Sequence, residues 1–325
     1  MALKAGIVGL PNVGKSTLFN AITKKNILAA NYPFATIDPN VGVVTVPDSR
    51  LEYLENLYVP ERTIPTTFEF TDIAGLVKGA ASGEGLGNKF LSHIRETDAI
   101  VEVVRCFDDA DIIHVEGKTD PIRDIEIINV ELILADLEIA ENRVSKIQKK
   151  AETTKDKDAV AEYEVLKKCV DALTNNIPLR HLEFSEDELL QLKNFNFITL
   201  KPIIYVANVS EDDVVVGENE YTKMVKEYAS KEGASVVVMC AKMESELSEL
   251  NDDDKKQFLN DLGIKNSGLD KLIFATYNLL GLQTFFTVGK DECRAWTFKI
   301  GMKAPECAGI IHSDFQRGFI KAEVT

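Results

Sequence analysis

Gly9-Leu10-Pro11-Asn12-Val13-Gly14-Lys15-Ser16-Thr17 is the stretch of this sequence that decides the fold. It has the form G-x-x-x-x-G-K-[ST], it follows the short apolar run 5–8, and it leads into residues 18–22, whose apolar positions have helical spacing. A strand, a glycine-bracketed loop and a helix in this order are typical of a loop whose backbone N–H groups bind phosphate oxygens. The sequence therefore predicts a nucleoside triphosphate site.

Each polar group of this loop has an expected role beside a bound triphosphate. Lys15 reaches the β- and γ-phosphates and is a catalytic as well as a binding residue, the Ser16 hydroxyl holds Mg²⁺, and Thr17 contacts an α-phosphate oxygen. Asn12 is also a candidate for helping to hold K⁺ beside the phosphates, so K⁺ is a candidate cofactor in addition to Mg²⁺. The predicted phosphate-side residues are Asn12, Val13, Gly14, Lys15, Ser16 and Thr17.

A second motif, Asp72-Ile73-Ala74-Gly75, ends the strand-like run 67–71. At the end of a strand downstream of a phosphate loop, D-x-x-G is typical of a segment that senses the γ-phosphate. We predict that Asp72 holds the Mg²⁺ shell through water and that the Gly75 N–H is a catalytic contact to the γ-phosphate. Thr36, in the Pro- and Asn-rich loop 31–40, is predicted to be a further metal ligand.

The group that orients the attacking water is not evident at its usual place. Leu76 follows the D-x-x-G motif where many GTPases carry a glutamine, and an aliphatic side chain cannot orient water. His114 is the candidate substitute, because imidazole accepts or donates a hydrogen bond near neutral pH. The alternative is that His114 merely packs between Ile113 and Val115.

Asn208-Val209-Ser210-Glu211 follows the apolar run 202–207, where a GTPase would carry N-K-x-D. The aspartate of that motif accepts two hydrogen bonds from guanine, and here Glu211 replaces it while Val209 replaces the lysine. An extra methylene displaces the carboxylate from a bidentate geometry, and missing hydrogen bonds weaken binding strongly. We predict that Asn208, Val209 and Glu211 contact the nucleotide, with adenine as the base.

A helical insert begins at Asp120-Pro121, an N-cap followed by proline at the first helical position. Apolar residues recur at spacings of 3 and 4 over 130–151 and again over 159–177, with a polar hinge between. This pattern predicts an antiparallel coiled-coil hairpin, the alternative being two helices packed flat on the core. The expected division is a nucleotide core over 1–120 and 200–282, an insert over 121–199, and an α+β module over 283–325 with a last strand at 318–324.

Composition excludes several classes of partner. The formal net charge of −15 argues against a surface built to coat nucleic acid or anionic membrane, so neither a membrane nor sequence-specific DNA is expected as a partner. No run approaches the roughly 18 apolar residues of a membrane span, and no signal peptide is recognisable. The five cysteines form no C-x-x-C pair, which favours free thiols in a reducing, cytoplasmic setting.

With these residues in place, the chain resembles Obg-like ATPases of the YchF type. The resemblance rests on residues 9–17, 31–40, 72–88, 208–211 and 304–315 and covers essentially the whole sequence. It implies an α/β fold with a Ras-like P-loop NTPase core, an inserted antiparallel coiled-coil helical domain and a C-terminal ubiquitin-like (TGS, β-grasp) module. It also implies Mg²⁺-dependent hydrolysis of ATP in preference to GTP, and binding to ribosomes or a ribosomal subunit.

The resemblance extends to single residues and has one departure. Leu76 matches the family's hydrophobic replacement of the glutamine, and His114 matches the histidine proposed to help instead. The family's TGS module continues beyond Thr325, so this sequence departs from the pattern there. The expected function is a nucleotide-controlled ATPase switch; a GTPase with relaxed base contacts and a nucleotide-gated binding module with incidental hydrolysis are the alternatives.

Overall fold

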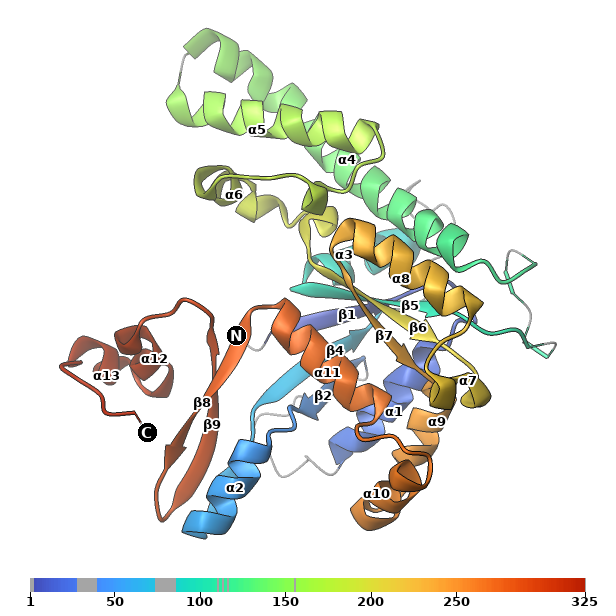
Figure 1. Ribbon diagram of the computed structural model, residues 1–325. Coiled ribbons are helices and arrows are strands. Elements are labelled where there is room, and N and C mark those ends of the chain that lie inside the picture. Colours follow the sequence, from blue (N-terminus) through green and yellow to red (C-terminus); the bar gives the residue numbers. More distant parts are fainter. Residues whose placement is uncertain are drawn as a thin grey trace.

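The computed structural model of the chain describes residues 3–27, 40–73, 86–109, 111–112, 114–115, 117–154 and 156–324 (Figure 1). The predictions made for Thr36, Gly75 and Leu76 lie outside these residues. The described parts contain a nucleotide core, a helical arm and a small C-terminal sheet with two helices.

A six-stranded sheet in the order β2-β4-β1-β5-β6-β7 lies at the centre of the core. Its strands are β1 (Lys4–Val8), β2 (Val41–Thr45), β4 (Thr67–Asp72), β5 (Ala99–Arg105), β6 (Ile203–Asn208) and β7 (Ser235–Met239). Neighbours are parallel, except that β2 is antiparallel to β4. β5 and β6 are buried at every position because helices cover both faces, which explains their nearly continuous apolar sequences. The predicted α/β nucleotide fold is confirmed.

Helices flank this sheet on both sides (Figure 1). The core contains α1 (Lys15–Ile27), α3 (Leu86–Arg95), α7 (Glu211–Val216), α8 (Glu220–Glu232), α9 (Ala241–Leu247), α10 (Asp252–Asp261) and α11 (Gly268–Leu279). One further helix, α2 (Ser49–Tyr58), packs instead against the C-terminal sheet. Across the described part of the chain, no helix is both long enough and apolar enough to cross a membrane.

The predicted helical hairpin is present as α4 (Pro121–Thr154) and α5 (Lys157–Thr174), which project from the core as an arm (Figure 1). α4 begins after Asp120, whose Oδ1 accepts a hydrogen bond from the Arg123 N–H at 3.1 Å. The first half of α4 packs on the core, and its second half packs against α5 in a separate apolar cluster. The first half of α4 therefore packs on the core, as in the alternative considered from the sequence, and its second half forms the helical hairpin with α5.

The apolar pattern over 130–151 and 159–177 predicts a seam of buried side chains between the two helices, and the two outer ends of this seam are wrong. Val130 and Ile177 are 41% and 40% exposed, whereas Ala140 and Leu173 within the seam are buried. α5 ends at Thr174, so Ile177 lies beyond the helix, and no segment of α5 extends far enough to cover Val130. The chain returns to the core through short helices: η2 (Leu179–His181), α6 (Glu186–Leu192), η3 (Lys193–Phe195) and η4 (Ile198–Leu200).

A three-stranded sheet in the order β3-β9-β8 forms the C-terminal module together with α12 (Ala304–Ile311) and α13 (Ser313–Arg317). β8 (Leu282–Val288) and β9 (Glu292–Lys299) are antiparallel, and β3 (Arg62–Ile64) joins β9 in parallel. A short segment from the first hundred residues therefore completes a sheet that the sequence analysis assigned to 283–325 alone.

The strand predicted over 318–324 is wrong. These residues have no regular structure, and Ile320 and Val324 are almost fully exposed. Alternating apolar residues form a strand only where a neighbouring strand supplies backbone partners, and none lies beside them in the described part of the chain.

Candidate nucleotide site

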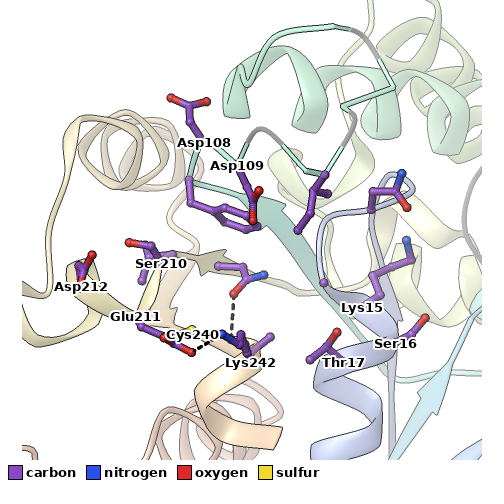
Figure 2. Close-up of a pocket in the computed structure, with 17 residues that line it drawn as sticks. Lys15, Ser16, Thr17, Asp108, Asp109, Ser210, Glu211, Asp212, Cys240 and Lys242 are labelled. Atoms are coloured by element: carbon purple, nitrogen blue, oxygen red, sulfur yellow. Dashed lines mark hydrogen bonds and ion pairs between the residues drawn. The ribbon is translucent and has the colours of Figure 1, made fainter.

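A cavity of about 670 Å³ lies at the carboxyl ends of β1, β5, β6 and β7 (Figure 2). Four segments that follow these strands line it: Asn12 and residues 14–17, residues 107–109 with Ile112, residues 208–212, and residues 240–242. Open α/β sheets bind ligands at this edge, because the loops after parallel strands meet there. The cavity brings together every described nucleotide-binding residue predicted from the sequence except Val13, whose side chain is buried in the core.

The phosphate loop requires glycine at position 14 for a steric reason. Gly14 has φ +102°, and a Cβ atom there would lie 2.3 Å from Nδ2 of Asn208. α1 begins directly afterwards at Lys15, so its first N–H groups and the positive end of its dipole face the cavity. This arrangement suits an anion.

Lys15 and Asp72 carry opposite charges that lie close enough to shift each other's pKa. Lys15 is only 7% exposed, and its Nζ donates a hydrogen bond to the Leu10 carbonyl at 2.6 Å. Burial lowers the pKa of Lys15 to about 8, although attraction to Asp72 partly offsets this. Burial likewise raises the pKa of Asp72, and Lys15 opposes that shift. Lys15 lines the cavity, whereas Asp72 is not among the described residues that line it.

The residues predicted to hold Mg²⁺ fit that ion where the structure describes them. Ser16 exposes its hydroxyl in the first turn of α1, and Asp72 ends β4 beside Ile7 of β1. Hydroxyl and carboxylate oxygens are ligands that Mg²⁺ accepts while keeping phosphate and water in its remaining positions. Within the described ranges, no group of three or more His, Cys, Asp and Glu side chains converges on a metal position.

Asn208 connects two walls of the cavity. Its Nδ2 donates to the Val13 carbonyl at 2.9 Å, and its Oδ1 accepts from the Ala241 N–H at 2.9 Å. The side chain therefore holds the phosphate loop against the segment that begins α9. This role was not foreseen from the sequence, which suggested only a contact to the nucleotide.

Glu211 and Lys242 lie at the end of the cavity opposite Lys15 (Figure 2). Glu211 is the first residue of α7, which Ser210 caps by accepting a hydrogen bond from the Asp213 N–H. The Glu211 carboxylate lies 3.0 Å from Nζ of Lys242, and both side chains are substantially exposed. Val209 is only 2% exposed and belongs to the core, although it borders the cavity.

Phe107 and Ile112 line the cavity and were not predicted as site residues. They follow β5, which lies between the strand of the phosphate loop and the strand that ends at Asn208. The strand order would have identified them, because the loop after a strand that lies between β1 and β6 borders the same carboxyl edge of the sheet as the phosphate loop.

His114 lies behind this segment and is not among the described residues that line the cavity. Its side chain is buried, and Nε2 is 2.8 Å from Oδ2 of Asp124 on α4. The other oxygen of Asp124 accepts from Nη2 of Arg123 at 3.2 Å. In this arrangement the histidine connects the end of the loop after β5 to the first turn of the arm.

Comparisons with known proteins agree with this description. A family model described as a 50S ribosome-binding GTPase matches residues 4–143, and one named YchF-GTPase_C, described as a protein of unknown function, matches residues 282–325. Proteins named ribosome-binding ATPase YchF from Bacillus subtilis (strain 168) and Escherichia coli O157:H7 are 62% and 54% identical over 99% of this chain and 88% of their own length. The solved structure of the Schizosaccharomyces pombe YchF GTPase matches with a TM-score of 0.87 at 43% identity, covering 98% of this chain and 86% of that one.

Proposed function

This chain belongs to the YchF family of P-loop nucleotide hydrolases, and on that premise we propose that it is a Mg²⁺-dependent ATPase that prefers ATP to GTP. We also propose that it acts as a nucleotide-controlled switch on the ribosome. The observation that carries the base preference is the Glu211–Lys242 pair at the base end of the cavity. The names of the relatives support the ribosome as partner, and a ribosomal partner implies a cytoplasmic location.

The preference for adenine follows from what Glu211 already contacts. To bind guanine, its carboxylate would have to present both oxygens to N1–H and the 2-amino group, and one of these oxygens already pairs with Lys242 at 3.0 Å. Adenine has no such pair of donors, so its binding leaves the ion pair intact. Guanine donors that find no acceptor in the site lose the hydrogen bonds that they make in water, which weakens the binding of GTP relative to ATP.

The reaction at the phosphate end of the cavity, beside Lys15, is in-line attack of water on the γ-phosphate. Lys15 and the N–H groups that begin α1 stabilise negative charge on the phosphate oxygens, and Asn208 fixes the loop that presents them. Ser16 and Asp72 would hold Mg²⁺, with Thr36 proposed from the sequence as a further ligand, and the ion supplies charge neutralisation when bound. The Gly75 N–H is proposed, also from the sequence, to contact the γ-phosphate.

Titration of the purified protein with ATP and with GTP, in Mg²⁺, tests the base preference. We expect ATP to bind at least about tenfold more tightly than GTP. Equal affinities would favour the GTPase with relaxed base contacts. A hydrolysis rate that ribosomes do not change, together with ribosome binding that depends on the bound nucleotide, would favour a binding module whose hydrolysis is incidental.

Glu211→Asp is expected to raise GTP affinity by about fivefold and to lower the ATP/GTP affinity ratio, because the shorter carboxylate leaves Lys242 and approaches the guanine geometry. Glu218→Asp is the matched control, since Glu218 and Lys226 form an equivalent pair at 3.0 Å outside the cavity. An unchanged ratio in both variants would mean that another group selects the base. Adding Val209→Lys, to restore the lysine that GTPases carry at this position, is unsuitable because it would bury an ammonium group in the core.

A monovalent cation beside the phosphates is a separable part of the proposal. Asn12 lines the cavity, is exposed, and has φ +62° in the phosphate loop. If its side chain helps to hold K⁺, hydrolysis should be about tenfold faster in K⁺ than in Na⁺ at equal ionic strength, because a fixed cation stabilises developing charge. Asn12→Ala should remove the difference, and equal rates in the two salts for the unmodified protein would refute this part.

A further inference from the structure

Arg105, the last residue of β5, is a buried arginine whose guanidinium binds the backbone of the segment that follows it. It is 2% exposed, and its guanidinium donates to three backbone carbonyls of the segment that follows. Nε donates to Phe107 at 3.1 Å, Nη1 to Ile112 at 2.9 Å, and Nη2 to Asp109 at 3.3 Å. Residues 106–109 and 111–112, which we call the wall segment, therefore curl around one side chain.

The wall segment separates two hollows of the molecule. On one side lies the nucleotide cavity, and on the other a cavity of about 700 Å³ bordered by His114, Lys118 and Tyr221. Asp108, Asp109 and Ile112 border both. A segment with open space on two sides gains little from apolar packing, so its hydrogen bonds determine its conformation.

Other described side chains also contact the segment, and one of them, Thr119, donates to the Phe107 carbonyl at 3.3 Å. Tyr221 donates to a carboxylate oxygen of Asp108 at 2.8 Å, and Asn219 donates to the Cys106 carbonyl at 2.8 Å. Arg105 alone contacts carbonyls at both ends and the centre of the curl. A planar guanidinium has five donors in a fixed fork, which a lysine ammonium does not reproduce.

Arg105 also orients the aromatic side chain that faces the nucleotide. Its guanidinium carbon lies 4.7 Å from the centre of the Phe107 ring, a geometry of favourable cation–π contact. Phe107 lines the cavity, and Figure 2 shows Asp108 and Asp109 of the same segment above Ser210 and Lys242 in the view.

We propose that Arg105 is a positioning residue for nucleotide binding, acting through the wall segment and not by touching the nucleotide. Without it, the segment samples other conformations, and binding has to include the cost of ordering it. ATP and ADP should be affected alike, since the γ-phosphate is held by other groups. The inference rests on the proposed function only in that the cavity binds a nucleotide.

Arg105→Met is the test, with Arg180→Met as the matched control. Arg180 is also a buried arginine, donating to Asn129 at 2.9 Å and lying 3.5 Å from Glu232, and it lies outside the nucleotide cavity. We expect Arg105→Met to raise the Kd of both ATP and ADP about tenfold or more, and Arg180→Met to leave both Kd values within about twofold while lowering the melting temperature. Hydrogen exchange of the unliganded proteins should show faster exchange over 106–112 only in Arg105→Met.

Two results would overturn the proposal: nucleotide affinity within about twofold of the unmodified protein in folded Arg105→Met, or equal losses of affinity in both variants. If Arg105→Met does not fold, Arg105→Lys takes its place, because it keeps the buried charge but not the fork, and it should still weaken both nucleotides severalfold. Unchanged affinity in that variant would also overturn the proposal. A preference of the unmodified protein for GTP would refute the ATPase assignment and leave this comparison valid with GTP and GDP.

Discussion

Lys15→Met is expected to weaken ATP binding by about a hundredfold or more while the protein stays folded. The Lys15 ammonium is the one cation of the phosphate loop, and it already lies in the cavity with its hydrogen bond to Leu10. Its burial disfavours the charged form, which is why its pKa falls to about 8. Replacing it by an apolar side chain of similar length therefore removes a charge that the fold does not need. Nucleotide titration and thermal unfolding, measured on the same sample, separate the two effects.

Lys24→Met is the control for that experiment, because Lys24 lies on the same helix and pairs with Glu249 away from the cavity. It should change neither nucleotide affinity nor, by more than a few tenths of a kcal/mol, the free energy of unfolding. Retention of tight ATP binding by Lys15→Met would disprove the assignment of residues 9–17 as the phosphate loop.

His114→Ala is expected to lower kcat by about a hundredfold while ATP affinity stays nearly unchanged, if His114 supplies the polar group that Leu76 cannot. In this structure His114 is paired with Asp124 at 2.8 Å, so the catalytic role requires that the pair separate and the loop carry the ring toward the nucleotide. Single-turnover hydrolysis with saturating ATP measures the effect without interference from product release.

Asp124→Asn distinguishes catalysis from packing. It removes the carboxylate charge from the same pair and leaves the imidazole in place, so it should lower stability in the direction that His114→Ala does and keep kcat within severalfold. If both variants lose stability and both keep their kcat, the histidine is a structural residue that secures the arm to the core. The catalytic role would then have to be given up.

The sequence by itself determined the parts of this protein whose geometry depends on neighbouring residues. The glycine spacing of residues 9–17 implied the phosphate loop, because a left-handed backbone at Gly14 is compatible with almost no other residue. Asp120 and Pro121 marked the start of α4 because capping and the fixed φ of proline act within one turn. The two long stretches with helical spacing of apolar residues indicated the hairpin, because that spacing depends only on residues three and four positions apart.

Only the tertiary structure decided which distant segments meet. Nothing near Phe107 in the sequence shows that it shares a cavity with Gly14 and Lys242, since that depends on the strand order of the sheet. The partnership of β3 with β9, the bridge made by Asn208 and the pairing of His114 with Asp124 likewise join residues through space. The expected strand at 318–324 failed for this reason. A strand or a polar side chain finds its partner through the fold, and local sequence carries no information about a partner that lies far along the chain.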